Sequence, residues 1–326
     1  MSDREQSKRP LLDVQGLRKY FPVRGALGNT VQQVKAVNDV SFQLYRGETF
    51  GMVGESGCGK STLGRTILRL TEPSAGRAIY EGKDIFAMSQ SELQAIRQDM
   101  QMVFQDPFSS LNPRKRIGDI LQEPLDIHDI GDKAERTEKV LAMLKRVGLQ
   151  AEHYYRYPHE FSGGQRQRIG IARALMVAPK LIVCDEPVSA LDVSIQSQII
   201  NLLKQLQNEF GLTFLFIAHD ISVVRYISDR VGVMYLGQMV ERAPTDCVFA
   251  TPLHPYTQAL LSSVPVPNPQ IKREKIVLTG EIPSPLNPPR GCVFHTRCPF
   301  AKAQCQTTVP VSKEVSPDHH VACHLY

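Results

Sequence analysis

The chain has 326 residues, 42% of them hydrophobic and 22% charged, which suits one large or two modest folded domains and excludes an intrinsically disordered protein. Its net charge of +5 is mild for this length and gives no basic footprint for binding nucleic acid. Because residues 1–10 are polar and no apolar run approaches the roughly 18–20 residues that cross a bilayer, we expect a cytoplasmic protein that reaches a membrane only through integral partners.

Strand-like and helix-like segments alternate over residues 11–250, and this alternation predicts an α/β core. The clearest helix candidate, Lys133–Val147, places Val140, Leu144 and Val147 on one face and is followed by Gly148. The strand candidates Leu181–Cys184 and Thr213–Ala218 are continuous and largely apolar, which indicates a sheet that is covered on both faces. The expected strands are Leu11–Gln15, Ala36–Leu44, Thr49–Val53, Met100–Gln105, Leu181–Cys184 and Thr213–Ala218, with a further helix over Ser61–Leu70.

A glycine-rich loop follows the strand candidate Thr49–Val53 and precedes the helix candidate. Its residues Gly54, Glu55, Ser56, Gly57, Cys58, Gly59, Lys60 and Ser61 match G-x-x-x-x-G-K-[ST], with Thr62 next in the helix. Glycines allow backbone N–H groups to turn toward phosphate oxygens, and the helix N-terminus adds its positive end. We expect Lys60 to bind the β- and γ-phosphates and Ser61 to bind Mg²⁺, while Cys58 occupies a variable position without assigned chemistry.

Two carboxylates end the apolar strand Leu181–Cys184. A carboxylate at the end of a parallel strand can reach Mg²⁺ beside a phosphate loop. We therefore expect Asp185 to be a Mg²⁺ partner and Glu186 to be the general base that polarises the attacking water.

A second glycine motif, Ser162-Gly163-Gly164-Gln165, opens a predicted helix. Ser162 and Gln165 have the spacing of a capping box, which also describes an ordinary helix start. Two adjacent glycines additionally leave the helix N-terminus bare for an anion to approach.

In this order and spacing, the motifs resemble those of ATP-binding-cassette (ABC) ATPases over residues 11–250. The resemblance implies a phosphate-loop ABC nucleotide-binding domain with a helical subdomain at about 106–178. It makes Ser162–Gln165 the signature that covers ATP held by a second cassette. The resemblance also implies that Gln105 senses Mg²⁺, that His219 contacts the γ-phosphate and that Ser189-Ala190-Leu191-Asp192 forms the D-loop. An aromatic ring would stack on the adenine, either that of Phe21, which we favour, or that of Tyr20.

Further segments narrow the resemblance to the ATPases of oligopeptide and dipeptide importers, in particular the second ATP-binding subunits of dipeptide permeases. These segments are Phe104–Arg114, His254–Leu261 and the tail from Gly291 to Pro299. The resemblance implies a related second ATPase, two membrane permeases and a separate solute-binding protein, with this chain at the cytoplasmic face of the inner membrane and no nucleic-acid partner. It leaves open that the imported solute is nickel or glutathione. An exporter, a soluble ATPase of repair or translation, and a metal-cluster sensor are weaker alternatives.

The chain changes character at about residue 251, where a loop-rich extension begins. Twelve of the 22 prolines lie between Pro252 and Pro317. Four of the seven cysteines, Cys292, Cys298, Cys305 and Cys323, are separated by five, six and seventeen residues, so no C-x-x-C pair is present. We expect these four thiolates to hold a structural 4Fe–4S cluster, as the family resemblance supports, with zinc or free thiols as the alternatives.

Overall fold

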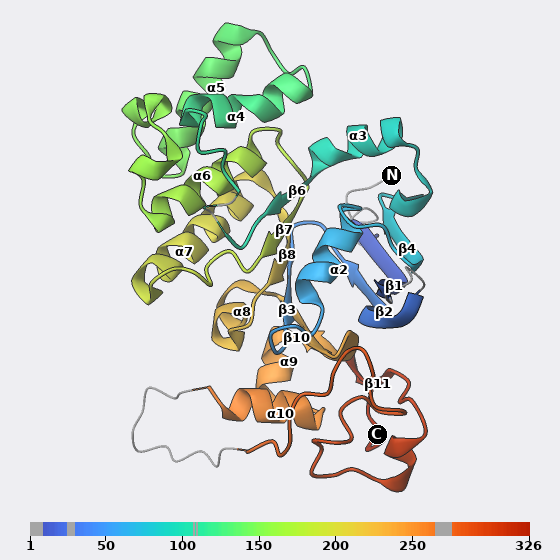
Figure 1. The fold of residues 1–326 in the computed structure, drawn as a ribbon. Coiled ribbons are helices and arrows are strands. Elements are labelled where there is room, and N and C mark those ends of the chain that lie inside the picture. Colours follow the sequence, from blue (N-terminus) through green and yellow to red (C-terminus); the bar gives the residue numbers. More distant parts are fainter. Residues whose placement is uncertain (1–8, 25–29, 107, 109, 265–275) are drawn as a thin grey trace, which may run out of the picture. The chain divides into compact units, whose positions relative to one another are not determined.

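A computed structural model describes residues 9–24, 30–106, 108, 110–264 and 276–326, and Figure 1 shows its ribbon. Most of the expected polar tail, together with Pro107 and Ser109, lies outside the described residues. The chain divides into two compact units. The first contains residues 1–44, 49–87 and 218–326, and the second contains residues 45–48 and 88–217.

The first unit contains an antiparallel sheet with the strand order β2-β1-β4-β5. Leu12 pairs with Leu44 on one side and with Tyr80 on the other, and all three side chains are buried. The expected strands Leu11–Gln15 and Ala36–Leu44 are confirmed as parts of β1 and β2. Both strands extend beyond the predicted bounds because they continue as an antiparallel ribbon. The bounds are β1 Leu12–Arg24, β2 Thr30–Leu44, β4 Ala75–Tyr80 and β5 Lys83–Asp84.

A second group of strands in this unit leads into the glycine-rich loop. β3 (Thr49–Val53) is buried at all five residues and pairs in parallel with β9 (Arg230–Tyr235). β9 pairs antiparallel with β10 (Gln238–Pro244), and β12 (His319–Val321) joins β10 and β11 (Lys313–Ser316). The helices of this unit are α2 Lys60–Ile67, α8 Ile221–Ile227, α9 Thr245–Ala250 and α10 Pro255–Ser262.

The second unit combines three parallel strands with most of the longer helices. β7 (Leu181–Asp185) lies between β6 (Met100–Val103) and β8 (Thr213–Ile217), and both pairings are parallel. Together with the first unit, this confirms the α/β prediction. The helices, green to yellow in Figure 1 apart from α3, are α3 Gln90–Asp99, α4 Ile117–Ile127, α5 Lys133–Arg146, α6 Gly163–Leu175 and α7 Val193–Phe210.

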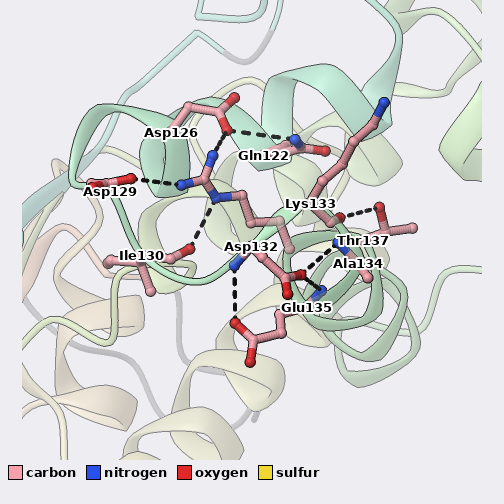
Figure 2. Close-up of polar contacts among 10 residues, drawn as sticks. Gln122, Asp126, Asp129, Ile130, Asp132, Lys133, Ala134, Glu135 and Thr137 are labelled. Atoms are coloured by element: carbon pink, nitrogen blue, oxygen red, sulfur yellow. Dashed lines mark hydrogen bonds and ion pairs between the residues drawn. The ribbon is translucent and has the colours of Figure 1, made fainter.

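Helix α5 begins where the sequence predicts, because its first turn is fully capped. The Asp132 carboxylate accepts hydrogen bonds from the backbone N–H groups of Ala134 and Glu135 at 2.8 and 2.9 Å (Figure 2). The Glu135 carboxylate accepts one from the Asp132 N–H at 3.0 Å, which completes a capping box. Arg136 then joins this turn to α4 through an ion pair with Asp126, and a second ion pair links it to Asp129, just beyond α4.

The C-terminal extension, orange to red in Figure 1, belongs to the first unit and is joined to β10 through a buried carboxylate. Glu241 of β10 is 1% exposed and accepts hydrogen bonds from the backbone N–H groups of Leu253 and His254 at 2.8 and 2.9 Å. The Nε2 atom of His319 on β12 lies 2.7 Å from the same carboxylate. Two separate segments of the extension, at Leu253–His254 and at His319, therefore converge on one residue.

Among the described residues, no helix is both long enough and apolar enough to cross a bilayer.

The stability of this attachment should depend on pH through His254. Burial lowers the pKa of His254 to about 4, and its Nδ1 accepts the hydrogen bond of the Tyr256 N–H that caps α10, which requires the neutral ring. The unfolded chain takes up this proton near pH 6.5, so stability is complete above that pH and falls between pH 6.5 and 4, by about 3 kcal/mol in all. We expect the His254→Asn variant, which keeps a capping side chain without titrating, to lose less stability over this range.

Urea unfolding at several pH values measures this difference. A parallel His159→Asn variant, at an exposed histidine, shows how much of the change comes from losing any histidine. Equal pH slopes for the parent chain and His254→Asn would contradict the assignment.

Candidate functional site

The glycine-rich loop is held so close to its neighbours that side chains are excluded at two positions. Gly54 and Gly59 have φ angles of 155° and 106°. A Cβ at Gly54 would collide with the carbonyl oxygen of Met234, and one at Gly59 would collide with that of Ala36. Gly57 has a φ of 79° but open space around it. The glycines thus allow a loop that turns tightly from β3 into α2.

Lys60 is the first residue of α2, and its side chain turns back under the loop. It is 4% exposed, and its Nζ donates hydrogen bonds to the carbonyl oxygens of Gly54 and Glu55 at 2.8 and 3.1 Å. Nζ also lies 3.7 Å from Cys58 Sγ. Burial raises the pKa of the Cys58 thiol, partly offset by Lys60, so this thiol is protonated at neutral pH. Ser61 and Thr62 continue the first turn of α2.

The aromatic residues of β1 differ in how they are held. The Tyr20 hydroxyl donates to Asn38 Oδ1 at 2.5 Å, the Asn38 N–H donates to the Gly237 carbonyl, and the Gly237 N–H donates to the Cys58 carbonyl, each at 2.8 Å. Tyr20 is therefore linked to the phosphate loop by consecutive hydrogen bonds. Phe21 is 39% exposed, with Lys19 Nζ at 4.8 Å from its ring.

His219 belongs to the same unit as the loop. It is exposed and follows Ala218, whose N–H donates to the carbonyl oxygen of Met52 in β3 at 3.1 Å. Since Gly54 comes two residues after Met52, this bond places the backbone of His219 near the start of the loop.

Three predicted site residues come together in the second unit. Asp185 ends β7 and is fully buried. Glu186 follows in the left-handed conformation with a φ of 46°, and its carboxylate accepts a hydrogen bond from Gln105 Nε2 at 2.9 Å. Its backbone is fixed by its own N–H donating to Ile217 and by Ser189 Oγ donating to its carbonyl at 3.1 Å. A strained backbone at a non-glycine carboxylate is typical of a functional position.

The signature and the D-loop also meet in this unit. The capping box predicted for Ser162 and Gln165 is present: Gln165 N–H donates to Ser162 Oγ at 3.3 Å, and Ser162 N–H donates to Gln165 Oε1 at 3.0 Å. A Cβ at Gly164 would lie 2.6 Å from Ile195 Cγ2 of α7, and one at Gly163 would lie 3.4 Å from Leu191 Cδ2 of the D-loop. Besides leaving the helix N-terminus bare, Gly164 is thus required by its close packing on α7. Sequence reasoning missed this second requirement.

Sequence reasoning also missed the partners of Glu55. Arg297 Nη1 lies 2.9 Å from the Glu55 carboxylate, and the Glu55 N–H donates to the Tyr256 hydroxyl at 2.8 Å. Two signals were available in the sequence: the charge of Glu55 at a variable loop position, and Arg297 in the tail segment from Gly291 to Pro299. The sequence separation of 242 positions concealed the contact.

The 4Fe–4S prediction for Cys292, Cys298, Cys305 and Cys323 is wrong. The structure describes all four, yet within its described part no three or more His, Cys, Asp and Glu side chains form a group that could hold a metal ion. Backbone hydrogen bonds hold the segment, both in turns such as His295 N–H to Cys292 O at 3.1 Å and across it from Cys292 N–H to Cys305 O at 2.8 Å. Burial raises the pKa of the Cys292 thiol to about 11, so without a metal this thiol is protonated at neutral pH. The zinc alternative falls for the same reasons.

Comparisons with protein families match two parts of the chain. A family described as "ABC transporter" matches residues 37–189, and one described as "Oligopeptide/dipeptide transporter, C-terminal region" matches residues 240–305.

Two curated relatives cover nearly the whole chain. The oligopeptide transport ATP-binding protein AppF of Bacillus subtilis is 59% identical over 320 residues, with 97% of each chain covered. The dipeptide transport ATP-binding protein DppF of Haemophilus influenzae is 52% identical over 324 residues, with 99% of each chain covered.

Solved structures agree on the cassette. The ATP-binding cassette MJ0796, solved as a dimer in a post-hydrolysis state with ADP and Pi, superposes with a TM-score of 0.64 at 30% identity over 72% of this chain and 98% of that one. CbiO1 of Clostridium perfringens, part of the cbiONQ transporter complex, gives a TM-score of 0.63 at 29% identity over 75% and 92%.

The two loop glycines Gly59 and Gly57 should differ sharply in their tolerance of alanine. Gly59→Ala combines an unfavourable φ with a backbone collision, whereas Gly57→Ala meets only the conformational penalty of about 1–2 kcal/mol. We expect Gly59→Ala to abolish binding of a fluorescent ATP analogue and Gly57→Ala to retain measurable binding. Equal losses in the two variants would show that the close approach to Ala36 does not shape the loop.

Proposed function

The chain belongs to the ABC transporter ATP-binding subunits, in the oligopeptide/dipeptide branch, and on this basis we propose that it binds and hydrolyses ATP to power peptide import across a membrane. The observation that carries the proposal is the 59% identity over 97% of the chain to an oligopeptide transport ATP-binding protein. Peptide is the solute favoured over nickel or glutathione, because the relatives reported above are named for oligopeptides and dipeptides.

We assign the phosphate-binding roles to the loop of the first unit. The backbone N–H groups of residues 54–61 would cradle the phosphates, and Lys60 would exchange its carbonyl partners for the β- and γ-phosphate oxygens. Ser61 would bind Mg²⁺, and His219 would contact the γ-phosphate. A ring of β1, Phe21 or Tyr20, would stack on the adenine.

We assign water activation and the remaining Mg²⁺ contacts to the second unit. Asp185 and Gln105 would bind Mg²⁺ from this unit. Glu186 would polarise the attacking water and accept its proton, and the hydrogen bond from Gln105 orients the carboxylate that does this. The products are ADP and phosphate.

The chain has one phosphate loop and one signature, so turnover requires a second cassette. We propose that Ser162–Gln165 and the D-loop, Ser189–Asp192, contact ATP bound to that partner, which is a related but different ATPase chain. Two permease subunits would hold the pair at the cytoplasmic face of the inner membrane, and a separate binding protein would deliver the solute. No nucleic acid takes part.

Removing the carboxylate of Glu186 should stop hydrolysis while leaving binding intact. A general base accounts for roughly 10²–10⁴ in rate, so we expect Glu186→Gln to lower phosphate release by the assembled transporter at least 100-fold. Binding of a fluorescent ATP analogue should stay within about threefold, since Lys60 and the loop are unchanged. The exposed Glu138 of α5 gives the control variant Glu138→Gln, for which we expect parental turnover. Parental turnover by Glu186→Gln would refute the assignment.

The partner proposal is tested by gentle solubilisation of membranes, affinity capture of this chain and mass spectrometry. We expect two multispanning permeases and a second ATPase. Recovery of the chain alone, or with ribosomal or DNA-associated proteins, would refute the transporter assignment.

A further inference from the structure

The C-terminal extension reaches the phosphate loop through an ion pair that the assigned roles leave unused. Arg297 Nη1 donates to both carboxylate oxygens of Glu55, at 2.9 and 3.3 Å. Only 9% of the Arg297 side chain and 25% of the Glu55 side chain are exposed. Partial burial shields this pair from water and salt, so it is a stronger contact than an exposed surface ion pair.

A buried aromatic cluster fixes the position of Arg297. The rings of Tyr235, Tyr256 and Phe294 have centroids 4.7–5.5 Å apart, and each ring is at most 1% exposed. The Arg297 N–H donates to the Phe294 carbonyl at 3.0 Å, which forms a tight turn between the cluster and the ion pair. The guanidinium is therefore presented to the loop by a rigid support.

Fold stability alone explains Arg297 poorly. Its Nε is buried and finds no hydrogen-bond partner among the described residues. A buried donor without a partner is unfavourable, and an apolar side chain of similar size would fill the same space without that penalty. The guanidinium also donates to the Tyr235 hydroxyl at 3.5 Å, but its shorter contact, at 2.9 Å, is with the Glu55 carboxylate.

All three polar parts of Glu55 are held. Its N–H donates to the Tyr256 hydroxyl, its carboxylate binds Arg297, and its carbonyl oxygen accepts from Lys60 Nζ. The extension therefore positions Glu55, and the carbonyl oxygen of Glu55 in turn positions the Lys60 ammonium that we assign to the phosphates. We propose that Arg297 is a positioning residue of the nucleotide site, by which the C-terminal extension neutralises Glu55 and sets the affinity of the phosphate loop for ATP; this rests on the proposed ATPase function.

The negative charge of Glu55 predicts the direction in which the ATP affinity should change. An unpaired carboxylate in this loop would repel the triphosphate and attract Lys60 away from it. Loss of Arg297 should consequently weaken ATP binding only while residue 55 carries its negative charge.

A double-mutant cycle on the full chain tests this, with a fluorescent ATP analogue and Mg²⁺ as the probe. We expect Arg297→Gln to raise the Kd roughly tenfold, about 1.4 kcal/mol. In the Glu55→Gln background the same substitution should change the Kd less than about twofold. Arg297→Lys, which keeps the charge, should recover most of the affinity.

Controls separate positioning from folding and from the proposed function itself. Arg290→Gln, at an exposed arginine of the same extension, should bind as the parent does. Urea midpoints identify any variant whose loss is merely unfolding. An equal penalty of Arg297→Gln in both backgrounds, or none in either, would overturn the inference. Failure of the parent chain to bind the analogue at all would instead refute the proposed function.

Discussion

The architecture of the candidate site depends on the close approach of the phosphate loop to two backbone carbonyls. The oxygens of Met234 and Ala36 occupy the space that side chains at Gly54 and Gly59 would need. This contact sets where the loop leaves β3 and where α2 begins, and hence where Lys60 turns back beneath it.

The same loop is the meeting point of segments that are distant in sequence. Gly237 donates to the Cys58 carbonyl, Tyr256 accepts from the Glu55 N–H, and Arg297 binds the Glu55 carboxylate. The first contact comes from the turn between β9 and β10, and the other two come from the C-terminal extension. The family comparison assigns a separate match to residues 240–305. In physical terms, however, this extension and the glycine-rich loop share hydrogen bonds and a partly buried ion pair.

Local features were predictable from the sequence because local physics determines them. The strand–loop–helix around Lys60, the capping box at Ser162 and the parallel strands β7 and β8 follow from spacing, propensity and apolar runs. Contacts between distant residues were not predictable, as the Arg297–Glu55 pair shows. The cysteine prediction failed as well: cysteine spacing and a family resemblance predicted a metal site, but the described residues contain no group of side chains that could hold a metal ion.

Peptide-stimulated ATP hydrolysis, measured together with peptide uptake, tests the account most directly. The complete transporter would be reconstituted in liposomes with ATP on the side of this subunit and a labelled dipeptide with its binding protein on the other. The account predicts uptake that requires ATP and hydrolysis that rises when loaded binding protein is added, both lost on Lys60→Ala. Uptake without ATP, or hydrolysis by Lys60→Ala at the parental rate, would contradict it.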